Sequence, residues 1–214
     1  MKRKSQLKNL RRKSASVLPG SVRIIAGQWR GRKLPVPVVE GLRPTPNRIR
    51  ETLFNWLQPR IAGADCLDLS AGTGSLCFES LSRGARAAVL VESSHTAVNQ
   101  IRENLKLLNA SNAIVLEESA RQYLLGQVKE FDIIFLDPPF KSDLVATCFA
   151  LIHERVWLKP GGLLYIEAPA KSKLPGLPTG WSLFRSKSSG EVGYHLLRFD
   201  GTEDIKKEEI VKNG

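Results

Sequence analysis

Short apolar runs alternate with amphipathic stretches along the chain from Ile61 to about residue 168. The apolar runs have the length of buried strands, and the stretches between them carry apolar residues at helical spacing. Strands are predicted over residues 65–69, 87–92, 113–117, 131–136 and 162–168, and helices over residues 74–82, 95–109, 119–126 and 143–157. Because strands and helices alternate, we expect a parallel sheet with helices on both faces.

After this region the pattern changes to two strands in succession. Trp181–Ser186 and Val192–Phe199 flank Ser188-Ser189-Gly190, which predicts an antiparallel hairpin. The hairpin brings the sheet to seven strands, most of them parallel. The predicted fold class is therefore α/β, with a doubly wound sheet that ends in a C-terminal antiparallel hairpin.

The region before the sheet predicts a small extension. Ser21–Val39 alternates apolar and basic residues around Gly27 and Gly31, which indicates a short β-hairpin. A helix over about Arg48–Leu57 follows, and Asn47 is placed to be its N-cap.

The chain is thus expected to have four parts. Residues 1–20 form a flexible basic arm, because their composition cannot bury enough apolar surface to order itself. Residues 21–60 form the hairpin and helix extension, and residues 61–200 form the sheet domain. Residues 201–214 form a charged tail, which we expect to be frayed.

Positive charge is concentrated in the first 60 residues. The net charge is +11; residues 1–60 contribute +13 and the remainder −2. A near-neutral body with one strongly basic end is typical of a protein that binds a phosphate backbone. The candidate phosphate contacts in the extension, which become RNA contacts if the backbone is that of RNA, are Arg30, Arg32, Lys33, Arg43, Arg48 and Arg50.

Cysteine, histidine and hydropathy patterns exclude several classes of protein. Cys66, Cys77 and Cys148 form no C-x-x-C pair, which favours reduced, buried thiols in the cytoplasm. The three histidines are scattered, so we predict no metal site. No apolar run approaches the roughly 18 residues that a membrane helix needs, so we predict no membrane association.

The strongest chemical motif is Asp137-Pro138-Pro139-Phe140, directly after the apolar run of residues 131–136. The prolines end the strand and leave an acid and an aromatic ring at its carboxyl end, where open α/β sheets bind ligands. This set suits methylation of an exocyclic amine on a nucleobase. Asp137 and the Pro138 carbonyl would each accept one N–H of the amine, and Phe140 would stack on the base.

A glycine-rich turn precedes this motif and predicts a nucleoside-bearing cofactor. The turn, Asp68 to Ser75, follows the first sheet strand, and its glycines let the backbone approach a ligand closely. Glu92 ends the next strand, where an acid can accept hydrogen bonds from ribose hydroxyls. The candidate cofactor residues are Asp68, Ala71, Gly72, Gly74, Glu92, Ser119 and Ala120.

With these motifs the sequence resembles the Rossmann-like S-adenosylmethionine-dependent methyltransferases. It resembles more closely the bacterial enzymes that methylate guanine N2 in 16S ribosomal RNA. The resemblance covers about residues 22–199 and rests on Arg23–Leu34, Leu42–Thr45, Arg48–Asn55, the glycine turn and Asp137–Phe140. It implies that Asp68, Gly72 and Gly74 line the cofactor, that Glu92 holds its ribose, that Ser119 and Ala120 lie by its adenine, and that Asp137, Pro138 and Phe140 hold the target base.

The sequence departs from the family pattern at three positions. Ser94 stands where a second acid is usual, and Pro46 and Asn47 stand where Thr-Asp is usual. The departures affect the details of cofactor contacts and of the helix cap.

The resemblance implies an enzyme that uses S-adenosylmethionine and acts on 16S ribosomal RNA or on the assembling small subunit. We expect it to be a monomer. The alternatives are an amino-methyltransferase acting on adenine in DNA or on another RNA, and a non-catalytic RNA-binding protein on a methyltransferase scaffold. The sequence does not identify the target guanine.

Overall fold

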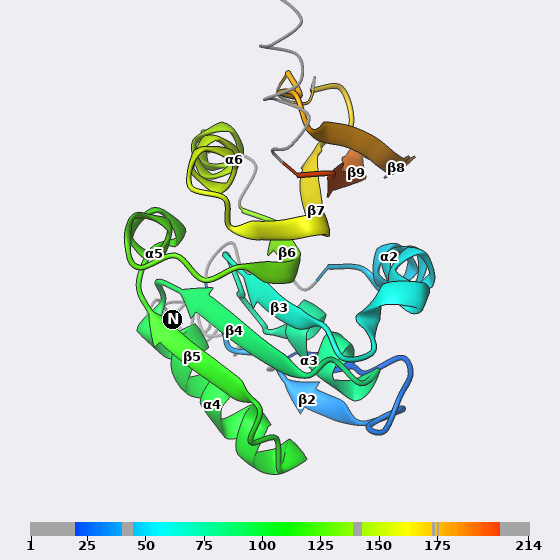
Figure 1. Cartoon of the computed structure of the whole chain (residues 1–214). Helices are drawn as coiled ribbons and strands as arrows, with labels where there is room; N and C mark the ends of the chain where they lie inside the picture. Colours follow the sequence, from blue (N-terminus) through cyan, green and yellow to red (C-terminus); the bar gives the residue numbers. More distant parts are fainter. Residues whose placement is uncertain (1–19, 40–44, 139–142, 173, 175, 202–214) are drawn as a thin grey trace, which may run out of the picture.

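A computed structural model describes residues 20–39, 45–138, 143–172, 174 and 176–201 of the chain. It confirms the α/β fold class, with a seven-stranded sheet in the order β5-β4-β3-β6-β7-β9-β8 (Figure 1). The strands are β3 (Asp65–Asp68), β4 (Ala87–Glu92), β5 (Ala113–Glu117), β6 (Phe131–Leu136), β7 (Leu158–Pro169), β8 (Trp181–Ser189) and β9 (Val192–Phe199).

The first five strands of the sheet are parallel, and the last two form the predicted hairpin. Leu67 of β3 pairs with Val89 of β4 on one side and with Ile134 of β6 on the other. The chain therefore winds outward from β3 in one direction and returns to β6 on its other side. The point between β3 and β6 is the topological switch point of the sheet, where ligands bind in open α/β folds.

Helices cover both faces of the sheet (Figure 1). One hydrophobic cluster joins the sheet to helices α2, α3 and α4, and a second joins it to α5 and α6. The helices are α2 (Asn47–Ile61), α3 (Ser75–Ser82), α4 (His95–Leu108), α5 (Ala120–Leu125) and α6 (Leu144–Glu154). The last four residues of β6 are buried and alternate between the clusters, since Ile133 and Phe135 lie in the first and Ile134 and Leu136 in the second.

The N-terminal hairpin forms as predicted and is anchored in the first cluster. Its strands, β1 (Ser21–Arg23) and β2 (Lys33–Pro35), pair antiparallel with Val22 opposite Leu34. Both of these side chains are buried with residues of α2 and α3. At Gly27 the hairpin approaches α3 so closely that an added Cβ would lie 1.8 Å from the carbonyl oxygen of Ser82.

Helix α2 differs from its prediction at both ends. Pro46 is its N-cap, and Asn47 is its first helical residue, so the prediction that Asn47 is the cap is wrong. The reason is that the Asn47 Oδ1 accepts a hydrogen bond from the buried guanidinium of Arg50 at 2.6 Å. The helix also continues past Leu57 and Pro59 to Ile61.

Within the described residues, no helix combines the length and the apolar character needed to cross a bilayer. The three cysteines are free and buried, as the sequence predicted.

Candidate active site at the carboxyl edge of the sheet

The glycine turn lies between the end of β3 and the start of α3. Gly72 and Gly74 have φ values of 53° and 74°, a region that side chains with a Cβ rarely adopt. Gly74 is the N-cap of α3, and a Cβ added there would lie 2.7 Å from the ring of Phe78. The backbone of the turn is therefore held in a conformation that only glycine adopts readily at these two positions.

Asp68 begins this turn and is almost completely buried, with 2% of its surface exposed. Burial raises the pKa of its carboxyl to about 8, and the negative charges of Asp137 and Glu92 contribute in the same direction. Three predicted site residues from β3, β4 and β6 are thus close enough to influence each other electrostatically.

Glu92 connects the end of β4 to the glycine turn. One carboxylate oxygen accepts the N–H of Gly72 and the other accepts the N–H of Ser94, both at 2.8 Å. Ser94, one of the departures from the family pattern, caps α4 by accepting the N–H of Ala97. Each carboxylate oxygen keeps a second lone pair, so Glu92 can still accept hydrogen bonds from hydroxyl groups of a ligand.

Ser119 and Ala120 form the start of α5 next to Glu92, since the N–H of Glu118 donates to the Glu92 carbonyl at 3.1 Å. Ser119 and Gln122 form a capping box in which the Ser119 N–H donates to Gln122 Oε1. The Ser119 N–H therefore already has a partner, and Ala120 is the better candidate for a backbone contact with a ligand.

Asp137 follows β6, the strand next to β3. Its Oδ2 accepts a hydrogen bond from the hydroxyl of Thr45 at 3.1 Å. Burial raises the pKa of Asp137 to about 6, and the bond from Thr45 opposes this shift. Pro138 is buried beside it, whereas Pro139 and Phe140 lie outside the described residues.

Sequence reasoning missed three residues near Asp137. Thr45 is 7% exposed and reaches Asp137 from the segment before α2. Tyr165 and Glu167 lie on β7, where the Tyr165 hydroxyl donates to Glu167 Oε1 at 2.7 Å. Thr45 belongs to the Leu42–Thr45 mark of the resemblance. Glu167 lies two residues before Pro169, the last residue of β7, so the strand-end criterion that selected Glu92 did not select it.

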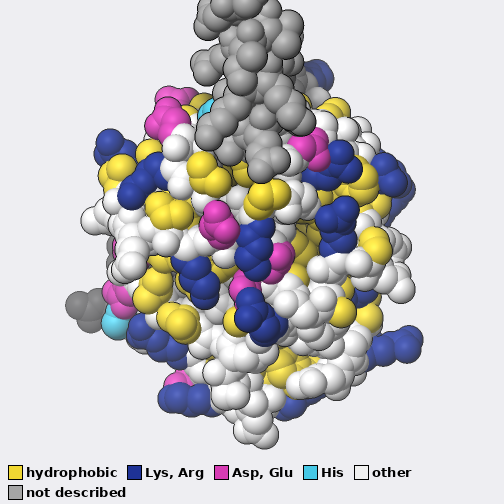
Figure 2. Space-filling model, in the orientation of Figure 1, with side chains coloured by type: hydrophobic (Ala, Val, Ile, Leu, Met, Phe, Trp, Pro, Cys, Tyr) yellow, Lys and Arg dark blue, Asp and Glu magenta, His cyan; other side chains and the backbone are white. Residues whose placement is uncertain are grey.

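The predicted RNA contacts fall into three groups. Arg30, Arg32, Lys33 and Arg48 are exposed, and Arg32 also donates to the Leu107 carbonyl at 2.6 Å. Arg43 lies outside the described residues. Lys and Arg side chains are spread over the face of the molecule shown in Figure 2.

For Arg50 the structure corrects the prediction. Its side chain is 1% exposed, donates to the Arg23 carbonyl at 2.8 Å and lies 3.8 Å from the carboxylate of Glu79. Burial lowers the pKa of its guanidinium, and the charge of Glu79 opposes this shift. Arg50 therefore joins the hairpin to α2 and α3 inside the protein and is not available to RNA.

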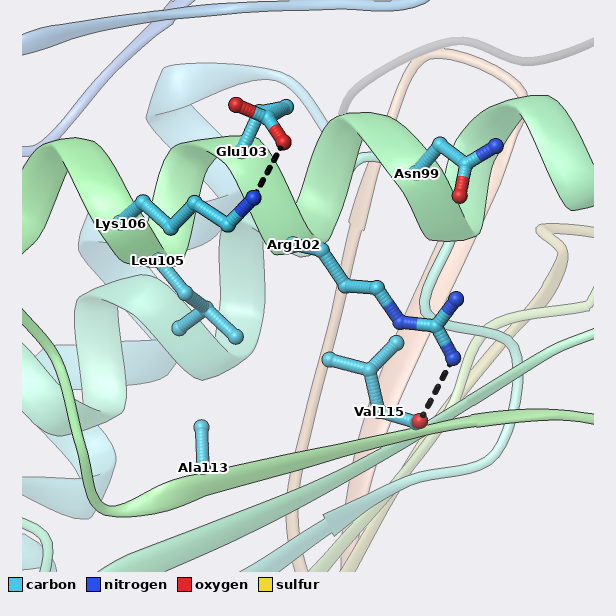
Figure 3. A pocket seen from close by; sticks show the side chains of 7 residues that line it. All are labelled: Asn99, Arg102, Glu103, Leu105, Lys106, Ala113 and Val115. Atoms are coloured by element: carbon cyan, nitrogen blue, oxygen red, sulfur yellow. Dashed lines mark hydrogen bonds and ion pairs between the residues drawn. The ribbon is translucent and has the colours of Figure 1, made fainter.

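An open hollow of about 470 Å³ lies elsewhere, between α4 and β5 (Figure 3). Arg102 donates to the Val115 carbonyl there, and Glu103 pairs with Lys106 at 2.8 Å. The hollow contains none of the predicted site residues, and its charged groups already have partners. Among the described residues no group of three or more His, Cys, Asp or Glu side chains is arranged to hold a metal ion.

Comparisons with known proteins place the chain in a family. Residues 22–198 match the family described as Conserved hypothetical protein 95, Cons_hypoth95. The chain is 46% identical over 179 residues to the "Ribosomal RNA small subunit methyltransferase D" of Escherichia coli K12, covering 84% of this chain and 90% of that protein. It is 47% identical over 183 residues to the Haemophilus influenzae protein of the same name, covering 84% and 94%. The solved structure of yhhF from Escherichia coli superposes with a TM-score of 0.79 at 45% identity, covering 85% of this chain and 99% of that one.

Proposed function

We propose a function from the premise that this chain belongs to the Cons_hypoth95 family, whose members include the ribosomal RNA small subunit methyltransferases D. The chain is an S-adenosylmethionine-dependent methyltransferase that acts on ribosomal RNA of the small subunit. Its substrate group is the exocyclic N2 amine of a guanine in 16S RNA. The observation that carries this proposal is the placement of Asp137-Pro138 at the switch point, next to the glycine turn.

The residues at the edge fit this cofactor. When bound, S-adenosylmethionine supplies a methyl group on a cationic sulfonium. Glu92 and Asp137 place negative charge beside Asp68 at one edge of the sheet, and such a site attracts a cation. We assign Asp68, Ala71, Gly72 and Gly74 to the cofactor wall, Glu92 to the ribose hydroxyls, and Ala120 with Ser119 to the adenine.

Asp137 and Pro138 solve the chemical difficulty of the reaction. The N2 amine of guanine is a poor nucleophile, because its lone pair is delocalised into the ring. Asp137 accepts one N–H and the Pro138 carbonyl accepts the other, which turns the nitrogen lone pair toward the methyl group. Thr45 fixes the Asp137 carboxylate by its hydrogen bond. The rate gain then comes from alignment and from a fixed negative charge beside the nitrogen where positive charge develops.

The extension is assigned to RNA. Arg30, Arg32, Lys33 and Arg48 are exposed on the hairpin and α2, and with Arg43 they would contact phosphates. We keep residues 21–60 as an RNA-binding extension and 61–200 as the methyltransferase domain, although both share one hydrophobic cluster. The basic arm, the charged tail, a monomeric state and a cytoplasmic location stay predictions from the sequence.

Single-turnover methyl transfer into small-subunit RNA tests the proposal. Asp137→Ala removes the fixed acceptor, so turnover should fall on the order of a hundredfold or more while cofactor affinity survives. Asp137→Asn keeps an acceptor oxygen without the charge and should be intermediate. In the wild type the rate should rise with pH through about 6, because the charged form of Asp137 is present above its pKa.

Asp200→Ala is the matched control, since this exposed acid after β9 pairs with Arg198. Near-wild-type transfer by Asp137→Ala would show that the amine is held elsewhere. Methyl transfer to adenine but not to guanine would show that the protein is a different kind of amino-methyltransferase.

A further inference from the structure

Glu167 is a buried acid at the carboxyl end of β7 that the proposed mechanism does not use. Only 4% of its surface is exposed. In the parallel register of β6 and β7, Phe135 pairs with Tyr165 and Leu136 with Ile166, so the next pair is Asp137 with Glu167. Neighbouring strands lie about 4.8 Å apart, and residues two positions apart share a face. Asp137 and Glu167 therefore lie side by side, above Phe135 and Tyr165.

The surroundings of Glu167 fix its carboxyl group in place. The Tyr165 hydroxyl donates to its Oε1 at 2.7 Å. Its partner on β9 is Tyr194, whose ring stacks on Trp56 of α2 with 5.5 Å between centroids. Such a carboxyl group presents its remaining hydrogen-bonding capacity in a defined direction.

The two neighbouring acids influence each other's ionisation. Burial raises the pKa of Glu167 well above its ordinary range, and the charge of Asp137 raises it further. Two buried acids side by side therefore favour a state in which they share one proton, and when Glu167 holds it, Asp137 carries the charge. A neutral carboxyl group offers one donor and one acceptor.

Guanine carries the complementary groups directly beside the amine to be methylated. Its N2 amine, N1–H and O6 follow one another along one edge of the base. When Asp137 accepts from the amine, the neighbouring position faces N1–H, a donor, and O6, an acceptor. Adenine has a lone pair at N1 beside its amine and no oxygen at the following carbon.

We infer that the carboxyl group of Glu167 pairs with N1–H and O6 of the target guanine and thereby selects guanine over adenine. The inference rests on the proposed function, because it concerns the same base in the same site. Tyr165 is a positioning residue, since it reaches the base only through Glu167.

Methyl transfer to 2-aminopurine tests the inference, because this base keeps the amine at C2 but lacks both N1–H and O6. The guanine that the wild type methylates is first mapped by mass spectrometry. Small-subunit RNA is then prepared by ligation with guanine or 2-aminopurine at that position. Each variant is compared with the wild type on each RNA, so intrinsic differences in amine reactivity cancel.

Glu167→Ala should lower transfer to guanine by about tenfold to a hundredfold and transfer to 2-aminopurine by less than about threefold. Glu167→Gln should retain most of the guanine preference, since its amide also offers one acceptor and a donor. Glu154→Gln, an exposed acid at the end of α6, is the matched control. If Glu167→Ala has a lowered melting temperature, Glu167→Met takes its place, because methionine keeps the side-chain volume without the hydrogen-bonding groups.

An equal loss on both RNAs would overturn the inference and leave the proposed function intact. A wild type that binds S-adenosylmethionine but transfers nothing to guanine would instead overturn the proposed function, and the inference with it. Loss of the guanine preference in Glu167→Gln to the level of Glu167→Met would also overturn the inference.

Discussion

Glu79 of α3 offers a direct test of how the hairpin is attached to the sheet domain. Its side chain is fully buried. Its carboxylate accepts the backbone N–H groups of Ile25 and Ala26 at 2.8 and 3.0 Å. It also pairs with Arg83 at 2.7 Å and with the buried Arg50 at 3.8 Å. We predict that Glu79→Ala destabilises the protein strongly.

The magnitude follows from the groups that the substitution leaves without partners. Removing one member of a buried ion pair costs about 3–5 kcal/mol. Each buried donor left unsatisfied costs about 1–3 kcal/mol. These costs overlap, because the same loosening of the hairpin lets water reach all of them. We expect a total loss of about 3–5 kcal/mol in the free energy of unfolding.

Urea denaturation followed by circular dichroism measures this loss. The matched control is Glu103→Ala, whose ion pair with Lys106 is exposed, with 61% and 73% of the two side chains accessible. That variant should lose less than about 1 kcal/mol. Limited trypsin digestion, with cleavage after Arg30 followed by mass spectrometry, separates detachment of the hairpin from global unfolding.

A loss below about 1 kcal/mol in Glu79→Ala, together with an unchanged rate of cleavage after Arg30, would refute the reasoning. The hairpin would then be held mainly by its apolar contacts, such as those of Val22 and Leu34. Glu79→Gln keeps one acceptor oxygen and should lie between the wild type and Glu79→Ala.

Two further predictions concern the ligands. Gly74→Val should abolish binding of S-adenosylmethionine and S-adenosylhomocysteine in calorimetry, because φ is 74° and the new Cβ would lie 2.7 Å from Phe78. The control is Gly176→Val, since an added Cβ there has no neighbour within 4 Å. Equal cofactor affinity in the two variants would contradict the assignment of the glycine turn to the cofactor. Replacing Arg30, Arg32 and Lys33 by Ala should weaken RNA binding and reduce its salt dependence by about 0.7–0.9 in slope per lost phosphate contact. The triple substitution should leave cofactor affinity unchanged, and the control Lys129→Ala should leave RNA affinity unchanged. If the triple substitution does not change RNA affinity, these charges serve only solubility.

The fold was predictable because its strands are apolar over nearly their whole length. The last four residues of β6 alternate between two hydrophobic clusters, so burial on both faces leaves an apolar run in the sequence. Helix boundaries were less predictable where a single side-chain hydrogen bond determines them. The start of α2 depends on Arg50, which takes the Asn47 side chain for its own hydrogen bond, and sequence patterns contain no sign of that contact.

Site residues at the ends of strands could be predicted from the sequence. Site residues that come from distant segments of the chain could not. Asp68, Glu92 and Asp137 all follow apolar runs, so their common edge follows from a parallel sheet. Thr45 reaches Asp137 from 92 positions earlier, and only tertiary structure brings the two together. Arg50 was predicted to contact RNA because it is a basic residue in the basic extension. Its side chain is instead held inside the protein beside Glu79, a buried acid on another helix.

The buried acids of this protein fall into two classes that differ in their partners. Glu79 pairs with Arg50 and Arg83, and Asp65 pairs with Arg86 and Lys159. In the part of the chain that the structure describes, Asp68, Asp137 and Glu167 form no ion pair, and burial raises the pKa of each.

An acid whose pKa is raised by folding contributes stability only while it stays protonated. This contribution is complete below the unfolded pKa of about 4 and is lost as pH rises through the folded value, about 8 for Asp68. Between these two values the unfolded chain has released the proton that the folded chain keeps, so much of the contribution is already lost near neutral pH. Structural acids are paired with cations, so an unpaired set gathered at the switch point is better explained by ligands that it binds. A cationic cofactor and a base edge rich in N–H donors would provide the partners that the protein itself does not supply.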